Sequence, residues 1–180
     1  MRHGETAWSL SGQHTSTTDL PLTEQGERRA EAVGKALAGK PFAAVYSSPM
    51  KRALDTCRIA GYGDRAIVTD DLREWTYGSY EGLTSAQIHE TAPTWTIWTG
   101  QPPGGESIDQ VAARARHFIE SAPAGPVAVF GHGHMLRVLA ACWLRVAPDM
   151  GRCFALSTGS ISVLGFERDT PVLQNWNQVT

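Results

Sequence analysis

The sequence has few cysteines and no spacing of the Cys-x-x-Cys type. Cys57, Cys142 and Cys153 are the three cysteines among 180 residues, and each has apolar neighbours in the chain. An odd number of cysteines without such a spacing argues against a disulfide framework. We therefore expect buried free thiols in a reducing compartment, which favours a cytoplasmic location.

Long apolar runs and an excess of charge of either sign are also lacking. No run approaches the roughly 18 residues of a membrane span, and the polar N-terminus does not resemble a signal peptide. The formal net charge is −2, so no general basic field would attract nucleic acid or an anionic membrane. Hydrophobic residues make up 42% and charged residues 19%, as in globular proteins with a substantial core. We expect one domain over residues 1–180.

Helical and strand patterns alternate along the chain. Spacing of apolar residues and capping signals predict helices at 23–37, from Ser48-Pro49 onward, at 84–90, after the Ser107/Gln110 capping box, and through 136–146. Short apolar runs predict strands at 43–46, 66–69, 126–130 and 161–166. This order predicts an α/β fold, a three-layer sandwich with a mainly parallel central sheet.

Basic residues and imidazoles stand at the junctions that follow predicted strands. Arg2, His3 and Gly4 begin the chain, where the glycine would let the backbone approach a ligand. Arg52 lies in the first turn of a helix, and His132 directly follows the clearest strand. Carboxyl ends of parallel strands meet at one sheet edge, so these cations and imidazoles should gather there to bind an anion.

Glu74 is the carboxylate that we expect to accompany these cations and imidazoles at the site. It stands in the segment Leu72 to Gly78, among aromatic and apolar neighbours. Such surroundings raise a carboxyl pKa and suit the group to general-acid catalysis.

Taken in order, these motifs resemble those of the histidine phosphatase superfamily, which has the phosphoglycerate mutase-like fold. The matching strings are Arg2-His3-Gly4-Glu5-Thr6, Ser48-Pro49-x-x-Arg52-Ala53-x-x-Thr56, Glu74 four residues before Gly78, and His132-Gly133. The resemblance extends to about Phe166. Longer strings at 8–15, 18–23 and 73–82 are similar to a branch that includes bacterial acid phosphatases and fungal sedoheptulose bisphosphatase.

The resemblance implies a role for each motif residue. His3 would attack phosphorus and form a covalent phosphohistidine, while Arg2, Arg52 and His132 would bind the phosphoryl oxygens. Glu74 would protonate the departing alkoxide and then activate water. The resemblance implies no metal and no other cofactor.

Further residues are expected at the entrance to the phosphate pocket. They are Ser9, Gln13, His14, Thr15 and Gly133. Trp95 and Trp98 are expected to serve mainly in packing. We place His134 outside the catalytic set, and we place His89 and His117 on the surface or in the core.

The acid segment favours a phosphatase over a mutase. Mutases of this family carry Asn-Glu-Arg-His-Tyr-Gly and a sizeable insertion that closes over the substrate. This chain is short and has Arg73-Glu74-Trp75-Thr76-Tyr77-Gly78 instead. We expect hydrolysis of small phosphorylated metabolites, such as sugar phosphates, by a monomer or homodimer, with cofactor-dependent phosphoglycerate mutase as the alternative.

Two alternatives of other classes remain. Three or more imidazoles from His3, His14, His132 and His134 would suffice for a zinc hydrolase, although neighbouring arginines would repel the metal. The second alternative is a binding protein without catalytic activity. The presence of all the motif residues together argues against it.

One feature departs from the family pattern. Members have a short apolar strand before Arg-His-Gly in the middle of the sheet, whereas only Met1 precedes Arg2 here. Either the start is assigned a few codons too late, or this first strand is truncated, or the fold tolerates its absence. A strand that is truly missing would leave unpaired backbone groups between interior strands and lower the stability.

Overall fold

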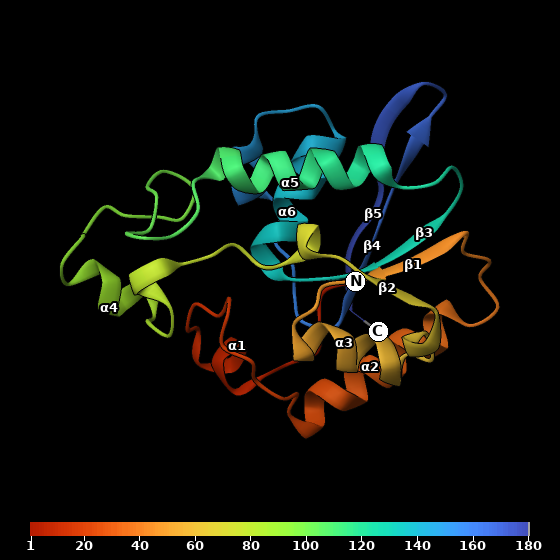
Figure 1. Ribbon diagram of the computed structural model, residues 1–180, viewed down its shortest axis with the longest axis horizontal. Coiled ribbons are helices and arrows are strands. Elements are labelled where there is room, and N and C mark those ends of the chain that lie inside the picture. The colour runs from red at the N-terminus through yellow and green to blue at the C-terminus, as the bar shows by residue number, and fades with distance from the viewer. Residues whose placement is uncertain (180) are drawn as a thin grey trace.

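The computed structural model describes residues 1–179. Its helices are α1 Ala7–Ser11, α2 Glu24–Leu37, α3 Lys51–Ile59, α4 Ser85–His89, α5 Ile108–Ser121 and α6 Gly133–Trp143. Its strands are β1 Ala44–Ser47, β2 Ala66–Val68, β3 Val127–Phe130, β4 Ser160–Glu167 and β5 Thr170–Val179. Parallel strands in the order β2-β1-β3 form one sheet, and β4 and β5 form an antiparallel hairpin (Figure 1).

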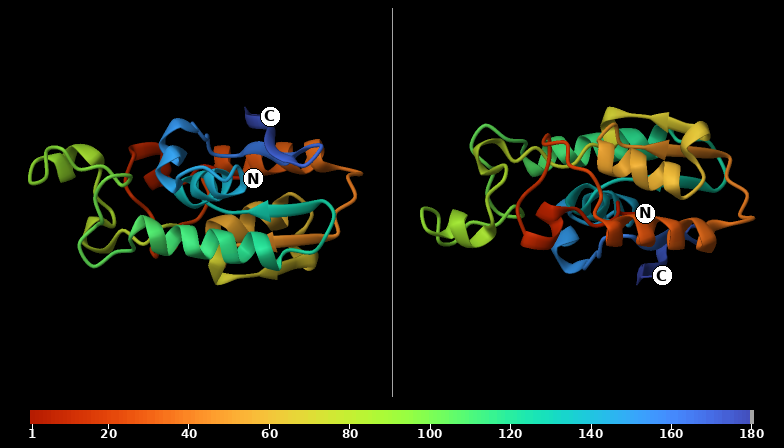
Figure 2. Two further views of the ribbon diagram at one scale, coloured as in Figure 1. Left: turned by 90° about the horizontal axis from the view of Figure 1, so that it is seen from above. Right: turned by 90° about the horizontal axis from the view of Figure 1, so that it is seen from below.

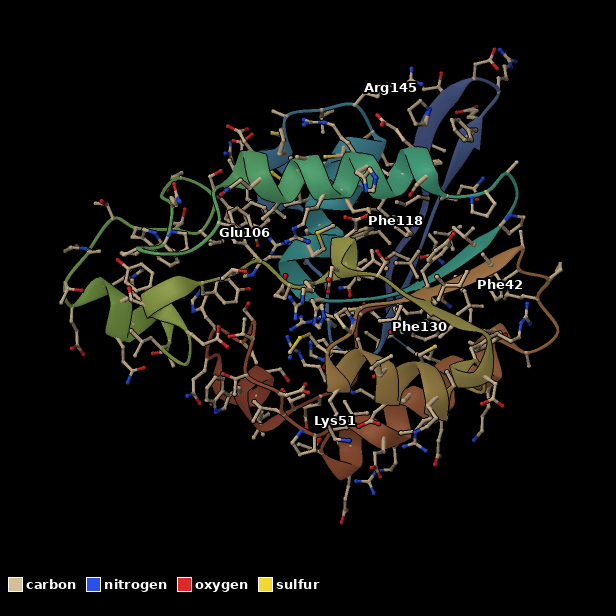
Figure 3. All side chains as sticks on the ribbon, viewed as in Figure 1. Phe42, Lys51, Glu106, Phe118, Phe130 and Arg145 are labelled. Atoms are coloured by element: carbon tan, nitrogen blue, oxygen red, sulfur yellow. The ribbon has the colours of Figure 1, made fainter. Side chains whose placement is uncertain are left out.

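Helices cover both faces of the parallel sheet, as the sequence predicts. Val45, Ala128 and Phe130 pack with residues of α2 and α3, whereas Tyr46 and Val129 pack against the cluster built from α5 and α6. Successive strand residues point to opposite faces, so each strand contributes to both cores. Figure 3 shows Phe118 beneath α5 and Phe130 on the α3 side. The predicted three-layer α/β architecture is confirmed.

The first three residues lie between β3 and β4. The Gly131 amide donates to the Met1 carbonyl, and the His3 amide donates to Gly131. On the other side, the Arg2 amide donates to the Ser160 carbonyl. The Gly159 amide also donates to the carbonyls of Arg2 and His3, so the residues at the position of the expected first strand are hydrogen bonded on both sides.

Most predicted elements are present, but two helix boundaries differ and one strand was not predicted. Helix α3 begins at Lys51 rather than at Pro49, and Met50 precedes it without a side-chain cap. Helix α6 ends at Trp143, so Val146 lies beyond it and is exposed. Strand β5 was not predicted, because a proline and several amide side chains interrupt its apolar pattern. The expectation of three buried thiols was wrong for Cys153, which is exposed.

Helix α4 and the loops around it project from one end of the molecule (Figure 2). The Ser107/Gln110 capping box is present and begins α5. Over residues 1–179, no helix has both the length and the apolar character needed to cross a bilayer.

Gly4 and Gly26 allow the nucleophile segment to lie directly against α2. A Cβ on Gly26 would stand 2.2 Å from the Glu5 carbonyl oxygen, and a Cβ on Gly4 would stand 2.4 Å from the Gly26 carbonyl oxygen. The side chain of Glu5 also accepts a hydrogen bond of 2.8 Å from Thr23, the N-cap of α2. Gly4 is therefore required for packing against the helix, a role that the sequence did not indicate.

We predict that Gly26→Ala destabilises the fold, although alanine is the better helix former. The added methyl group meets backbone atoms that cannot rotate away, so the free energy of unfolding should fall by about 2 kcal/mol. For a chain of this size that corresponds to a melting temperature lower by roughly 4–8 °C. Glu31→Ala, at an exposed position of the same helix, is the control and should change little. An increase in melting temperature for Gly26→Ala would contradict the close approach.

Candidate active site

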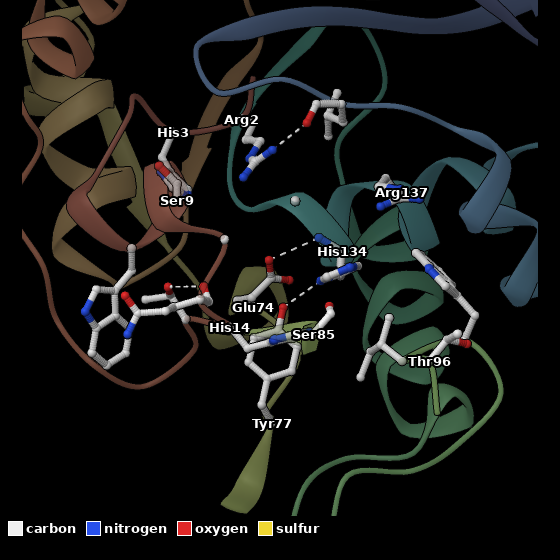
Figure 4. Close-up of a pocket in the computed structure, with 18 of the residues that line it drawn as sticks. Arg2, His3, Ser9, His14, Glu74, Tyr77, Ser85, Thr96, His134 and Arg137 are labelled. Atoms are coloured by element: carbon white, nitrogen blue, oxygen red, sulfur yellow. Dashed lines mark hydrogen bonds between the residues drawn. The ribbon is translucent and has the colours of Figure 1, made fainter. Parts of the chain in front are cut away.

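A cleft of about 420 Å³ opens where the chain leaves the carboxyl end of β3 (Figure 4). Its walls come from the N-terminal segment, the region around α1, the Glu74 segment and the beginning of α6. Arg2, Glu74 and His134 lie on different elements and face the same space in Figure 4. Segments far apart in the sequence are therefore brought together here, as predicted for the sheet edge.

The predicted site residues divide into two groups. Those that line the cleft are Arg2, His3, Ser9, Gln13, His14, Thr15, Glu74 and Gly133. Arg52 and His132 do not line it, because both are fully buried behind its wall.

His3 is buried and presents one free ring nitrogen. Its Nδ1 lies 2.7 Å from the carbonyl oxygen of Gly4, which can only accept, so Nδ1 carries the hydrogen. Burial, followed by the positive charges of Arg2 and Arg52, holds the pKa of His3 well below its usual value. The ring is therefore neutral near pH 7, and Nε2 has the lone pair that a nucleophile needs.

His132 has the opposite tautomer. Its ring centroid lies 5.2 Å from that of His3, and its Nε2 lies 2.7 Å from Oγ of Ser48. That oxygen already accepts from the Met50 amide, so the hydroxyl hydrogen is free to point to Nε2. Burial and then the charge of Arg52 lower the pKa of His132 well below its usual value. We infer a neutral ring that accepts from Ser48 at Nε2, and Nδ1 is then its N–H donor.

The two arginines are held by backbone carbonyl oxygens. Nη1 of Arg2 donates to Leu156. Nη2 of Arg52 donates to Thr15 at 3.1 Å and to Ser16 at 3.0 Å, and Nη1 donates to the loop that follows. Arg52 thus fixes the entrance loop, a role that the sequence did not indicate.

Three buried nitrogen atoms at this site have no hydrogen-bond partner. They are Nε of Arg2, Nε of Arg52 and Nδ1 of His132, and among residues 1–179 no other buried side-chain polar atom lacks a partner. Leaving a buried donor unsatisfied costs about 1–3 kcal/mol. All three are N–H donors, so an oxyanion is the ligand that would satisfy them. They belong to the three side chains that the resemblance assigns to phosphate.

Glu74 accepts three backbone hydrogen bonds. The amides of Trp75 and His134 lie 3.0 Å from its carboxylate oxygens, and the amide of Met135 lies 2.8 Å away. Two of these amides belong to the first turn of α6, where free N–H groups and the helix dipole favour an anion. The expected apolar surroundings are thus only part of its environment, because the partners that α6 supplies are distant in sequence.

Glu106 and Arg114 hold the Glu74 segment in place. The Thr76 amide donates to the Glu106 carboxylate at 2.9 Å, and the Trp75 indole donates to the Glu106 carbonyl. Arg114 forms two hydrogen bonds with the same carboxylate and another with the Arg73 carbonyl.

Several residues of the cleft were missed or placed elsewhere from the sequence. Tyr77, His89, Trp95, Trp98, His134 and Arg137 all line it. Trp95 and Trp98 also pack against the core, so their expected packing role is only half of what they do. His134 directly follows a motif residue, and that adjacency was the available signal. His117 is exposed and pairs with Asp71, as expected for a surface residue.

The imidazoles do not assemble as a zinc site. Within residues 1–179, no group of three histidine, cysteine or acidic side chains is arranged to hold a metal ion.

The model of the histidine phosphatase superfamily (branch 1) matches residues 1–179. The chain belongs to this superfamily. This histidine phosphatase is 42% identical over 173 residues to an acid phosphatase of Mycobacterium tuberculosis, covering 93% of this chain and 85% of the relative. It is 34% identical over 177 residues to the sedoheptulose 1,7-bisphosphatase of Saccharomyces cerevisiae, and this match covers 79% of this chain and 65% of the relative.

Structural similarity agrees with the sequence. The solved structure of an open reading frame product from Mycobacterium tuberculosis superimposes with a TM-score of 0.92 at 40% identity, covering 99% of this chain and 95% of that one. Phosphoglycerate mutases are also among the relatives. The predicted family, branch and enzyme class are confirmed: this histidine phosphatase is a phosphoric monoester hydrolase by family.

We predict that this phosphatase loses stability as the pH falls below about 6.5. His3 and His132 have lowered pKa values when folded, so below the unfolded value of about 6.5 the unfolded chain binds more protons. The contribution of the two neutral imidazoles to the free energy of unfolding is fully present above that pH. It declines as the pH falls towards the folded pKa values, by up to about 1.4 kcal/mol per pH unit for each histidine. Urea unfolding at pH 7.5, 6.5 and 5.5 in phosphate-free buffer measures it.

His132→Asn should reduce this pH dependence. Equal losses between pH 7.5 and 5.5 in the wild type and His132→Asn would contradict the buried neutral imidazole.

Proposed function

We propose that this enzyme hydrolyses phosphomonoesters of small metabolites through a covalent phosphohistidine on His3. One observation carries the proposal: three unpartnered buried N–H donors accompany a neutral imidazole whose Nε2 lone pair is free. The donors match the oxygens of a phosphoryl group, and the lone pair matches its phosphorus.

In the first step the phosphoryl group binds to Arg2, Arg52 and His132. Nε2 of His3 attacks phosphorus opposite the ester oxygen, so a P–N bond forms as the P–O bond breaks. Charge that develops on the phosphoryl oxygens is stabilised by the arginines, which supply the role that a metal ion has in other phosphotransferases. Positive charge is therefore present before the substrate arrives.

The departing alkoxide takes its proton from Glu74. Loss of the proton restores a carboxylate, which the amides of Trp75, His134 and Met135 hold in place. The same group is then ready for the second step.

In the second step water attacks the phosphohistidine. Glu74 accepts a proton from the water, the P–N bond breaks, and Nε2 of His3 regains its lone pair as phosphate leaves. A mutase would instead pass the phosphoryl group to a second hydroxyl. The acid segment favours hydrolysis, because it lacks the string that dedicated mutases carry.

Free thiols at Cys57, Cys142 and Cys153 support a cytoplasmic location.

We predict that His3→Ala lowers kcat for phosphomonoesters by at least about 1000-fold, because the covalent route is lost. Phosphate release from p-nitrophenyl phosphate and from sugar phosphates measures this loss. His117→Ala is the matched control and should retain activity. Glu74→Gln lacks the base for the second step, so it should accumulate protein-bound phosphate that is acid-labile and stable to alkali.

Labelled phosphate on Glu74→Gln but not on the His3→Ala/Glu74→Gln double variant would place the linkage on His3. Activity lost on chelation of divalent metals, or equal labelling of both variants, would contradict the proposal. Efficient conversion of 3-phosphoglycerate to 2-phosphoglycerate in an enolase-coupled assay would favour the mutase alternative.

A further inference from the structure

His134 and Tyr77 form a hydrogen-bonded pair inside the cleft. The Tyr77 hydroxyl lies 2.6 Å from Nδ1 of His134, and a dashed line marks this contact in Figure 4. Tyr77 is buried, and burial followed by the charge of Glu74 raises its pKa well above the usual value. Its hydroxyl therefore keeps its hydrogen and must donate it. Within the described chain, Nδ1 of His134 is the partner that this hydroxyl has.

Donation from Tyr77 fixes the tautomer of His134. With Nδ1 as acceptor, Nε2 of the neutral ring carries the hydrogen. No side chain or carbonyl in residues 1–179 accepts from this Nε2, and it is not among the buried unpartnered atoms. His134 therefore offers one N–H donor to the cleft.

His14 offers the complementary group. Its Nδ1 lies 2.9 Å from the Leu83 carbonyl oxygen, which only accepts, so Nδ1 carries the hydrogen. In the neutral ring Nε2 is then an acceptor, and no protein group described in residues 1–179 occupies it. His14 also lines the cleft, and its ring is nearly parallel to that of His134, at 8° with centroids 6.3 Å apart.

A donor and an acceptor on two facing rings match a hydroxyl group. A hydroxyl both donates and accepts, so it can accept from the nitrogen of one ring and donate to the nitrogen of the other. One hydroxyl or two adjacent hydroxyls would satisfy both nitrogens.

This pair lies on the leaving-group side of the site. The His134 amide donates to the Glu74 carboxylate, so its ring stands beside the group that would protonate the ester oxygen. Figure 4 shows His14, Tyr77 and His134 close together next to Glu74. A hydroxyl held there would sit near the ester oxygen of the substrate.

We propose that His134 and His14 recognise a hydroxyl of the leaving group, so that the preferred substrates are phosphate esters of polyols or sugars with a hydroxyl close to the ester oxygen. Tyr77 is the positioning residue that fixes the His134 tautomer. The inference rests on the proposed phosphatase activity.

Glycerol 1-phosphate and propyl phosphate test it, since they have the same carbon chain and differ in hydroxyl groups. Wild-type kcat/KM should favour glycerol 1-phosphate by at least about tenfold, the effect of one or two hydrogen bonds. His134→Phe and His14→Phe should bring this ratio close to one. His134→Gln retains an N–H donor and should keep part of it, and Tyr77→Phe should reduce it by freeing the tautomer.

His117→Phe is the matched control and should keep the wild-type ratio. Melting temperatures identify variants that fail to fold. If a phenylalanine variant of His134 or His14 does not fold, the ratios measured for His134→Gln and Tyr77→Phe test the inference instead. A wild-type ratio near one, or equal losses on both substrates in the His134 and Tyr77 variants, would overturn the inference and leave the phosphatase activity intact. Failure of the folded wild type to hydrolyse either ester would overturn the proposed function as well.

Discussion

Buried positive charge without a matching anion is the constraint that shapes this site. Arg52 is fully buried and Arg2 is half-buried at the wall of the cleft, and burial lowers the pKa of both guanidinium groups. The charge of Glu74 opposes this lowering more than any other charge does for either arginine. Its carboxylate oxygens, however, already accept hydrogen bonds from three backbone amides. Burying donors in this way is unfavourable unless a ligand completes their hydrogen bonds. A phosphoryl group carries both the charge and the oxygens that are missing.

The imidazoles of the cleft are prepared by their second partners. Gly4 and Ser48 give His3 and His132 opposite tautomers, so that one ring presents a lone pair and the other an N–H group. Leu83 and Tyr77 do the same for His14 and His134. In both pairs the partner, and not the histidine itself, decides which chemistry the ring can perform. In the mechanism and the further inference that we propose, four residues of one type serve as a nucleophile, an oxyanion donor, a hydroxyl acceptor and a hydroxyl donor.

The location of the site was predictable, because each motif adjoins an element that the sequence marks clearly. His132 follows β3, Arg52 lies in the first turn of α3, and both places belong to one sheet edge. The second partners were not predictable. Ser48 was expected to cap α3 and instead contacts His132, and the amides that bind Glu74 come from α6. Such contacts join residues distant in sequence, and local propensity carries no information about them. The hydrogen bond between Tyr77 and His134 could not be predicted for the same reason.

The central claim is that the unpartnered nitrogens of Arg2, Arg52 and His132 constitute an anion site. Calorimetric titration with inorganic phosphate tests it most directly, using the wild type, Arg52→Met and a control, Arg58→Met, on the exposed side of the same helix. We expect binding to the wild type and to Arg58→Met, with an affinity at least about tenfold lower for Arg52→Met. Unchanged affinity in a folded Arg52→Met variant, or no binding of phosphate to the wild type, would contradict it.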